Sequence, residues 1–343
     1  MQKVQTSTPA IRRRRWLTAA ATGLAGWAVA GPVASGAVRR LRLSHVVTED
    51  TPKGTMARAL QRHLQAQSGG RMALEVYPDS QLYGDEDELE ALRLGAVDLL
   101  APSLSKFAAG GFPAFELFDL PLLFDNLPQV RRITQGPIGA RLLGALAQRD
   151  MVGLGYLDNG FKHLSGPRVL RQPADLAGLR LRIQPSAVLS AQMRAWGAEP
   201  VALPFAETRR ALERAVVDGA ENTLSNFDTQ GLAAVQGHLT QTSHGYLGYA
   251  LVAGQRMWAR LAPHEQTWLR EAAAAALAEG NARAAALEQV ALAHLRQVPG
   301  LHIHNATATD RAALRAAAEP AYAAFGRRAG GAALAEVQRT LRG

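Results

Sequence analysis

Short apolar or alternating segments alternate along the chain with longer amphipathic ones. In residues 38–47, Leu41 and Leu43 alternate with polar side chains, which predicts a strand. Residues 51–68 have helical spacing and carry a proline in the first turn, which predicts a helix. The same reasoning predicts strands at 72–77, 97–101, 151–157 and 179–183, and helices at 85–94, 187–196 and 205–217. Strands that alternate with such helices predict right-handed crossovers and a parallel-type sheet. Because the alternation resumes after residue 151, we expect two α/β lobes.

The helix expected at 85–94 has an acidic start. Asp85 is the predicted N-cap, and Glu88, three residues later, is the predicted capping-box partner. The acidic run lacks the glycine that a calcium loop needs at its sixth position. We therefore interpret it as a helix start and not as a metal site.

Residues 263–297 are almost entirely Ala, Leu, Glu and Arg. A single helix of this length would be about 50 Å long and could brace a two-lobed body. Gly280 is the one interior glycine, so a shorter helical pair broken at that residue is the alternative.

Residues 1–37 have the pattern of an export signal: four consecutive arginines, an apolar segment, and small residues at 35–37. Arg13, Arg14, Trp16 and Leu17 resemble a twin-arginine signal. An ordinary secretory signal and an uncleaved anchor are the alternatives. No later segment has 18 uninterrupted apolar residues, so we expect a soluble protein in the periplasm.

Composition narrows the classes of function. The chain has 343 residues and no cysteine, which excludes disulfides, thiolate metal sites and cysteine nucleophiles. The formal net charge is +9, but residues 1–37 carry five basic residues and no acid, which leaves +4 for the rest. A charge of +4 with scattered arginines is a weak indication of a nucleic-acid partner.

Catalytic and metal-binding patterns are sparse. The chain has no G-x-S-x-G, H-E-x-x-H or G-x-x-x-x-G-K sequence. Ser103 and Lys106 match S-x-x-K, but no K-T-G accompanies them, so we do not expect an acyl-enzyme. His302 and His304 share one strand face without a third ligand nearby, so we expect a solvated strand edge there. We expect no catalytic residues, no metal and no cofactor.

Lysine is rare: among 38 basic residues, the lysines are Lys3, Lys53, Lys106 and Lys162. In a chain that uses arginine almost everywhere, the three lysines after residue 37 indicate places where a compact ammonium is required. Lys53 and Lys162 each follow a predicted strand, where α/β sheets place ligands. Chance retention on the surface is the alternative for each.

Two further polar positions are candidates for binding. Arg182 ends an alternating strand, where its planar guanidinium could hold a carboxylate with two parallel hydrogen bonds. An ordinary surface arginine is the alternative. Asn222 follows a helix end and a glycine turn, and could donate to a ligand or cap a turn.

These residues lie in segments that resemble the extracytoplasmic solute-binding receptors of tripartite ATP-independent periplasmic (TRAP) transporters, of the four-carbon dicarboxylate type. The resemblance extends from about residue 41 to residue 262. Its ordered motifs are Ser44-His-Val-Val, Asp50-Thr-Pro-Lys-Gly54, Tyr77-Pro-Asp-Ser-Gln-Leu-Tyr-Gly84, Ala101-Pro-Ser-Leu-Ser-Lys-Phe107, Phe118-Asp-Leu-Pro121, Asp158-Asn-Gly-Phe-Lys162, Arg182-Ile-Gln-Pro-Ser186, Val217-Asp-Gly219 with Glu221-Asn222, and Ser243-His-Gly-Tyr-Leu-Gly-Tyr249. The chain departs from the family at residue 220, where Ala replaces the commoner Gln, and at residue 223, where Thr replaces Pro.

The resemblance implies a two-lobed α/β clamshell, type II-like, with a ligand in the cleft and a long helix that bridges both lobes. It implies that lobe I comprises residues 38–159 plus 248–287, and lobe II residues 160–247 plus 288–343. It also implies that a membrane permease of the TRAP type receives the ligand.

The resemblance assigns candidate ligand-binding roles to six residues. Arg182 is placed to pair with a ligand carboxylate and Lys162 is a second basic position; the others are Asn222, Phe205, Lys53 and Ser103. We expect capture of malate, succinate or fumarate, with Lys53 or Lys162 at the second carboxylate. A receptor for a monocarboxylate or 2-oxo acid is the first alternative; an exported enzyme and an interaction protein are the others.

Overall fold

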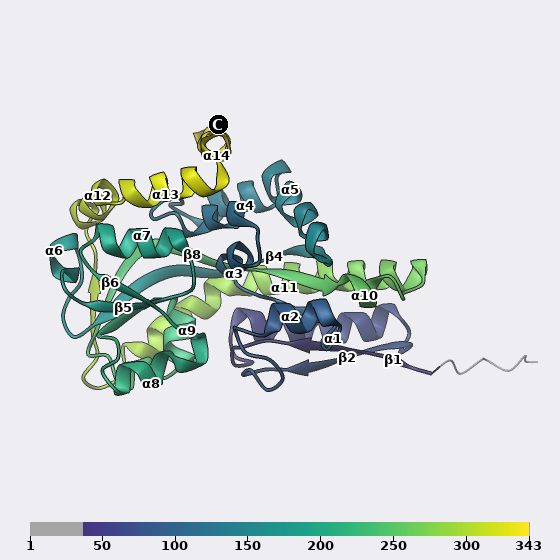
Figure 1. Ribbon diagram of the computed structural model, residues 1–343. Helices are drawn as coiled ribbons and strands as arrows, with labels where there is room; N and C mark the ends of the chain where they lie inside the picture. The colour runs from purple at the N-terminus through teal and green to yellow at the C-terminus, as the bar shows by residue number, and fades with distance from the viewer. Residues whose placement is uncertain (1–36, 343) are drawn as a thin grey trace, which may run out of the picture. The chain divides into compact units, whose positions relative to one another are not determined.

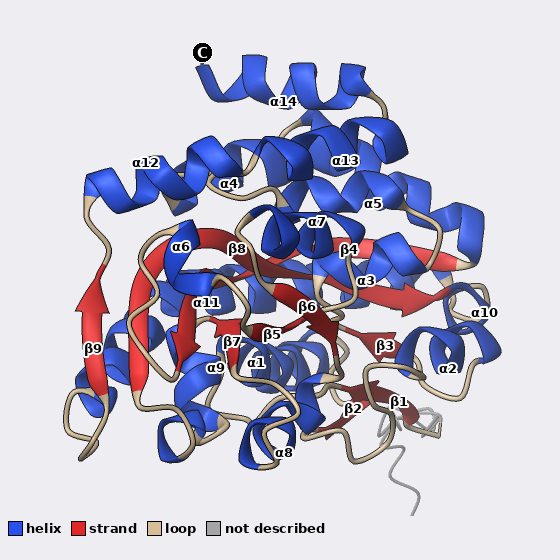
Figure 2. Ribbon diagram, turned by 60° about the vertical axis from the view of Figure 1, so that its left-hand side comes forward, coloured by secondary structure: helices blue, strands red, loops and turns tan. Residues whose placement is uncertain are grey.

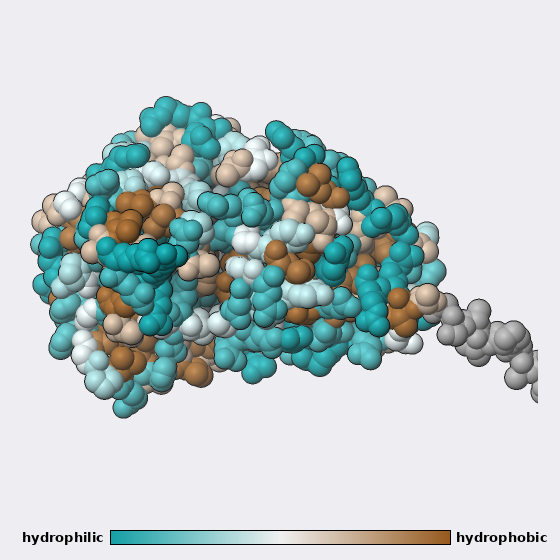
Figure 3. All heavy atoms as spheres, turned by 60° about the horizontal axis from the view of Figure 1, so that its bottom comes forward, coloured by the Kyte–Doolittle hydropathy of each residue, from teal (hydrophilic) through white to brown (hydrophobic). Residues whose placement is uncertain are grey.

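The computed structural model describes residues 37–342. The predicted export signal therefore lies outside the described residues, except for Ala37. Within residues 37–342, no helix is both long and apolar enough to cross a membrane. The face shown in Figure 3 is mostly hydrophilic, with separate apolar patches between the polar side chains.

The described residues form one mixed sheet covered by helices (Figures 1 and 2). The strands follow the order β2-β1-β3-β8-β4-β7-β5-β6, with β9 paired to β8. Their bounds are β1 Arg39–Ser44, β2 Met72–Tyr77, β3 Leu99–Leu100, β4 Met151–Gly166, β5 Arg180–Ile183, β6 Glu199–Ala202, β7 Gly219–Asn222, β8 His238–Gly254 and β9 His302–Asn305.

The expected α/β class is confirmed, but the sheet is not parallel throughout. Strands β1, β2 and β3 pair in parallel, as do β5 with β6 and β7. The central strands β4 and β8 are antiparallel to each other, from Met151 opposite Gly254 to Gly166 opposite His238. These two long strands join the parallel groups at either end of the sheet.

Fourteen α-helices surround the sheet in the described part of the chain. Their bounds are α1 Pro52–Gln67, α2 Glu88–Leu94, α3 Leu104–Ala109, α4 Leu127–Thr134, α5 Pro137–Ala145, α6 Pro173–Leu176, α7 Ala187–Ala195, α8 Thr208–Glu213, α9 Leu224–Thr229, α10 Gln255–Trp258, α11 Pro263–Leu295, α12 Ala308–Ala317, α13 Glu319–Ala329 and α14 Gly331–Arg342. Figure 1 shows α1 and α2 beside β1 and β2, and α7 to α9 beside β5 and β6. Each group of parallel strands thus has its own helical cover, which gives the fold two lobes.

Helix α11 is continuous over 33 residues, so the alternative of a break at Gly280 is wrong. Gly280 is buried where α11 crosses α1 and β4. A Cβ atom there would lie 2.7 Å from Leu157 Cδ1 and 3.0 Å from Met56 Cβ. The glycine therefore allows close packing and does not end the helix.

Other local predictions require correction. Helix α2 begins at Glu88 after an N-cap at Asp87, so Asp85 is not the N-cap of this helix. The apolar segment 97–101 pairs as a strand only at Leu99–Leu100. The helix expected at 205–217 is a 3₁₀ turn, Phe205–Glu207, followed by the short α8. The strand expected at 151–157 continues to Gly166, so Lys162 lies within a strand and not after one.

Candidate functional site

A narrow cavity lined by charged and polar side chains lies between the two groups of parallel strands. All six predicted binding residues line it, and they come from different elements. Its lining consists of Val46, Val47, Lys53, Asp85, Ser103, Lys106, Lys162, Arg182, Gln184, Phe205, Glu221, Asn222, Asn226, Leu247 and Tyr249.

Arg182 lies in β5 and is buried, with 2% of its surface exposed. Its Nε and Nη2 atoms donate to the carbonyl oxygen of Leu203, at 3.0 and 2.8 Å. Burial lowers the pKa of the guanidinium, while Asp85 and Glu221 raise it, and an arginine remains charged at neutral pH. The bonds to Leu203 fix one edge of the guanidinium, so that the Nη1–Nη2 edge is available for a carboxylate. The alternative of a surface arginine is wrong.

Lys162 is equally buried, but its charge is already matched. Its Nζ donates to Glu221 Oε1 at 2.6 Å, and Glu221 Oε2 lies 2.9 Å from His244 Nε2. Burial opposes ionisation of Glu221, but Lys162 and His244 outweigh it and lower the pKa of the carboxyl to about 2. The carboxylate of Glu221 therefore neutralises Lys162 within the protein.

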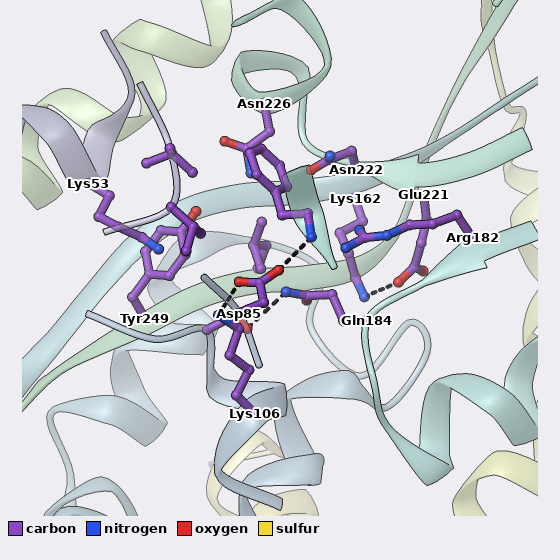
Figure 4. A pocket seen from close by; sticks show the side chains of 15 residues that line it. Lys53, Asp85, Lys106, Lys162, Arg182, Gln184, Glu221, Asn222, Asn226 and Tyr249 are labelled. Carbon is purple, nitrogen blue, oxygen red and sulfur yellow. Dashed lines mark hydrogen bonds and ion pairs between the residues drawn. The ribbon is translucent and has the colours of Figure 1, made fainter. Parts of the chain in front are cut away.

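Lys53 lies in the first turn of α1 with 1% of its surface exposed. Its Nζ is 3.9 Å from the centre of the Tyr249 ring, a cation–π contact. Among the described residues, no carboxylate or carbonyl accepts a hydrogen bond from this ammonium. Figure 4 shows Lys53 and Arg182 on opposite sides of the cavity.

Asp85 and Lys106 form the wall between this cavity and an outer groove. The Lys106 ammonium contacts the carboxylates of both Asp85 and Glu88. The other oxygen of Asp85 accepts a hydrogen bond from the backbone N–H of Phe205. Asp85 thus connects the α2–α3 side of the cavity to the β6–α8 side.

A second connection crosses the cavity through amide and hydroxyl groups. Gln184 Nε2 donates to Ser103 Oγ at 2.8 Å, and Ser103 is the N-cap residue of α3. Because Asp85 and Glu88 hold Lys106 as a charged ammonium, Lys106 offers no neutral amine that could take a proton from Ser103. This geometry agrees with the expectation that the S-x-x-K sequence is not an acyl-enzyme pair.

Two asparagines line the wall near the end of β7. The Asn222 side chain accepts from the Thr223 N–H at 3.0 Å and lies 3.5 Å from Gln230 Oε1. Asn222 therefore does stabilise a turn, while it also lines the cavity. The Oδ1 atom of Asn226 is buried without a hydrogen-bond partner in the described chain.

Sequence reasoning missed several residues of the cavity, chiefly Asp85, Gln184, Glu221, Asn226 and Tyr249. The rarity of lysine did indicate Lys106. Four basic side chains line the cavity against two carboxylates. Within residues 37–342, no group of three His, Asp or Glu side chains is arranged to hold a metal ion.

The two-lobed α/β fold with a charged cavity between its strand groups defines the class of receptors that enclose a small solute. Residues 43–328 match the family described as bacterial extracellular solute-binding protein, family 7 (DctP), and the chain belongs to this family. The resemblance of the sequence to TRAP transporter receptors is thereby confirmed.

Individual relatives agree with this assignment. The chain is 41% identical over 298 residues to the C4-dicarboxylate-binding periplasmic protein DctP of Rhodobacter capsulatus, covering 87% of this chain and 90% of that protein. A TRAP periplasmic solute-binding protein from Shewanella oneidensis, solved with bound succinate, has a TM-score of 0.84 at 35% identity and covers 88% of this chain and 98% of that one. A similar protein from Pseudomonas aeruginosa, with bound L-malate, has a TM-score of 0.80 at 37% identity and covers 83% and 99%.

Proposed function

We propose that this protein captures a four-carbon dicarboxylate, such as succinate, malate or fumarate, in the periplasm and delivers it to a TRAP permease in the membrane. The observation that carries the proposal is the pair formed by Arg182 and Lys53. Both are buried cations on opposite sides of the cavity, and neither contacts a carboxylate of the protein. A buried charge needs a partner, and a molecule with a carboxylate at each end supplies two.

The charges of the cavity favour Lys53 over Lys162 at the second carboxylate. Glu221 already neutralises Lys162, whereas Lys53 contacts an aromatic face. In this proposal Arg182 holds one carboxylate through its Nη1–Nη2 edge and Lys53 holds the other. Ser103, Asn222 and Asn226 are placed to bind the remaining oxygens, and Phe205 forms part of the wall.

Relatives support this ligand class. The relative from Rhodobacter capsulatus is named for C4-dicarboxylate binding, and the two solved proteins above contain succinate and L-malate.

A micromolar dissociation constant corresponds to a binding free energy of about −8 kcal/mol. A few charge-assisted hydrogen bonds, at roughly 1.5–3 kcal/mol each, can supply this after the costs of ordering are subtracted.

Ligand-induced shifts in melting temperature, measured with a panel of organic acids, test the proposal. We expect C4 dicarboxylates to stabilise the protein and Arg182→Ala to abolish the shift. Lys53→Met should weaken binding of succinate far more than binding of a monocarboxylate of similar size. If Arg182→Ala binds succinate normally, the assigned site is wrong; equal effects of Lys53→Met on both acids would favour the monocarboxylate receptor.

We further propose that the protein binds its ligand without chemical change, because, among the described residues that line the cavity, no hydroxyl is hydrogen-bonded to an unpaired base. Turnover of any bound acid by the purified protein would contradict this.

Export through the twin-arginine route is proposed from the Arg13-Arg14-x-Trp16-Leu17 pattern. Loss of export in cells without that translocase tests the route.

A further inference from the structure

Three lysines line the cavity, and all three are buried, which makes their surroundings directly comparable. Lys106, with 7% of its surface exposed, contacts Asp85 and Glu88. Lys162, with 2% exposed, contacts Glu221. Lys53, with 1% exposed, contacts the ring of Tyr249 and no carboxylate. Lys53 is therefore the ammonium whose positive charge the protein itself compensates least.

The groups that face Lys53 from neighbouring elements do not replace a counter-ion. His45, which follows β1, is buried without a partner on either ring nitrogen. Burial, and secondarily the charge of Lys53, lower the pKa of His45 to about 3, so this imidazole is neutral at pH 7. Asp85 and Glu88 attract the ammonium from a distance, but both are bound to Lys106, whose own charge repels Lys53.

Removing an ammonium from water without pairing it favours its neutral form. Burial lowers the pKa of Lys53 to about 7. The charges of Glu88 and Asp85 oppose this shift, whereas the charge of Lys106 adds to it. Lys106 experiences the same burial, yet Glu88 and Asp85 raise its pKa above the ordinary value. The comparison shows how strongly a carboxylate in contact with a buried ammonium changes its protonation in this cavity.

We propose that Lys53 takes up a proton when a dicarboxylate enters the cavity, so that ligand capture is coupled to the pH of the periplasm. The coupling rests on the function proposed above, because it requires a ligand carboxylate to act as the missing counter-ion. The bound carboxylate stabilises the charged form of Lys53 and raises its pKa. Above pH 7 the free receptor holds a neutral Lys53 in part, so binding must draw a proton from solution.

The direction of the pH dependence follows from linkage. A process that takes up a proton becomes less favourable as pH rises, so affinity falls above pH 7, by up to about tenfold per pH unit. Below pH 7 Lys53 is already charged and this dependence levels off. Asp119, which is buried beside Ser105, also titrates near this range: burial raises its pKa to about 6, against the opposing effects of Lys162 and the hydroxyls of Ser105 and Ser186. Asp119 is ionised at pH 8, so measurements at pH 8 separate the two groups.

Isothermal titration calorimetry with fumarate tests the coupling, since both carboxyl groups of fumarate ionise below the pH range used. Titrations at pH 8 in phosphate and in Tris, whose ionisation enthalpies differ, give the number of protons exchanged. We expect uptake approaching one proton per fumarate at pH 8 and little uptake from Lys53 at pH 6.5. Binding of fumarate at pH 8 with the same heat in both buffers, after correction for dilution, would overturn the coupling while leaving the proposed function intact.

Lys53→Arg is the matched variant, because a guanidinium stays charged over the whole range. We expect it to bind fumarate without proton uptake and without the loss of affinity between pH 7 and pH 8.5. Continued uptake of one proton by folded Lys53→Arg would assign the proton to another group and reject Lys53. If this variant does not fold, the two-buffer titration of the unchanged protein still shows whether fumarate binding takes up a proton. Failure of every C4 dicarboxylate to bind at any pH would instead reject the proposed function.

Discussion

At the scale of single residues, the charged side chains of the cavity fall into two groups: those paired within the protein and those without a carboxylate partner. Glu221 is bound on one side by Lys162 and on the other by His244, and all three side chains are buried. These groups satisfy each other without a ligand. Arg182 and Lys53 lack such carboxylate partners, and we propose that they bind the ligand. We therefore distinguish cations that a carboxylate of the protein already neutralises from cations that have no such partner.

Lys162→Met should destabilise the protein by about 3–5 kcal/mol, because it leaves the Glu221 carboxylate buried without its ammonium partner. Urea unfolding at pH 7 measures the loss. The double variant Lys162→Met, Glu221→Leu should recover most of it, since no unpaired charge then remains. Equal stability of the single and double variants would show that the pair is not coupled.

The pair of Lys162 and Glu221 also predicts how the free energy of unfolding depends on pH. The folded-state pKa of Glu221 is about 2, below its ordinary value of 4.5. Its contribution is therefore fully present above pH 4.5 and is lost as pH falls toward 2. Glu221→Gln should flatten the unfolding free energy over this range, relative to the unchanged protein.

At the scale of secondary structure elements, prediction succeeded where the local pattern determines the element. The alternating segment 72–77 is β2 without any shift of its ends, and the Ala-rich segment is the single helix α11. Prediction failed for β4, because the Asp158-Asn159-Gly160 sequence has the composition of a turn. In the fold this sequence is an irregularity in the register between β4 and β8. Distant partners satisfy its polar groups: Tyr246 donates to Asp158, and Asn159 donates to Thr223.

The candidate site shows the same limit. Arg182, Lys53 and the other predicted residues could be found because their motifs are local in sequence. The roles of Asp85 and Glu221 could not, because Asp85 meets Lys106 across 21 residues and Glu221 meets Lys162 across 59. From the local sequence, Asp85 is the expected N-cap of the helix. In the fold, its carboxylate instead contacts Lys106 and the backbone N–H of Phe205 beside the cavity.

Gly280→Ala tests the packing of α11. Alanine favours a helix interior by about 1 kcal/mol over glycine, but its Cβ would press on the buried side chains of Leu157 and Met56. We expect a net destabilisation of roughly 1–2 kcal/mol by denaturant unfolding. Gly144→Ala in α5 is the matched control, because a Cβ there meets no atom within 4 Å, and it should be neutral or slightly stabilising. A stabilising Gly280→Ala would show that the close contact with α1 and β4 is not needed.

At the scale of the whole molecule, contacts between the proposed lobes occur on two sides. In the C-terminal helices, Arg328 donates to Glu116 and Tyr322 donates to the carbonyl of Pro121. At the cavity, Asp85 accepts from Phe205 and Gln184 donates to Ser103. We propose that residues 38–159 plus 248–287 move against residues 160–247 plus 288–343. The contacts at the cavity are then the ones that break on opening, since they surround the space that a ligand must enter.

Small-angle X-ray scattering with and without succinate tests this motion. A ligand that contacts both lobes favours the closed form by its differential affinity, so we expect a smaller radius of gyration when succinate is bound. Gln184→Ala removes the hydrogen bond to Ser103 and the longer one from Ser105, and should speed succinate dissociation several-fold, as stopped-flow measurements would show. Gln241→Ala is the control, because its exposed amide bonds to Asn305 between β8 and β9, away from the cavity. An unchanged radius of gyration at saturating succinate would mean that the lobes do not close on the ligand, and the cross-cavity bonds would then be permanent parts of the fold.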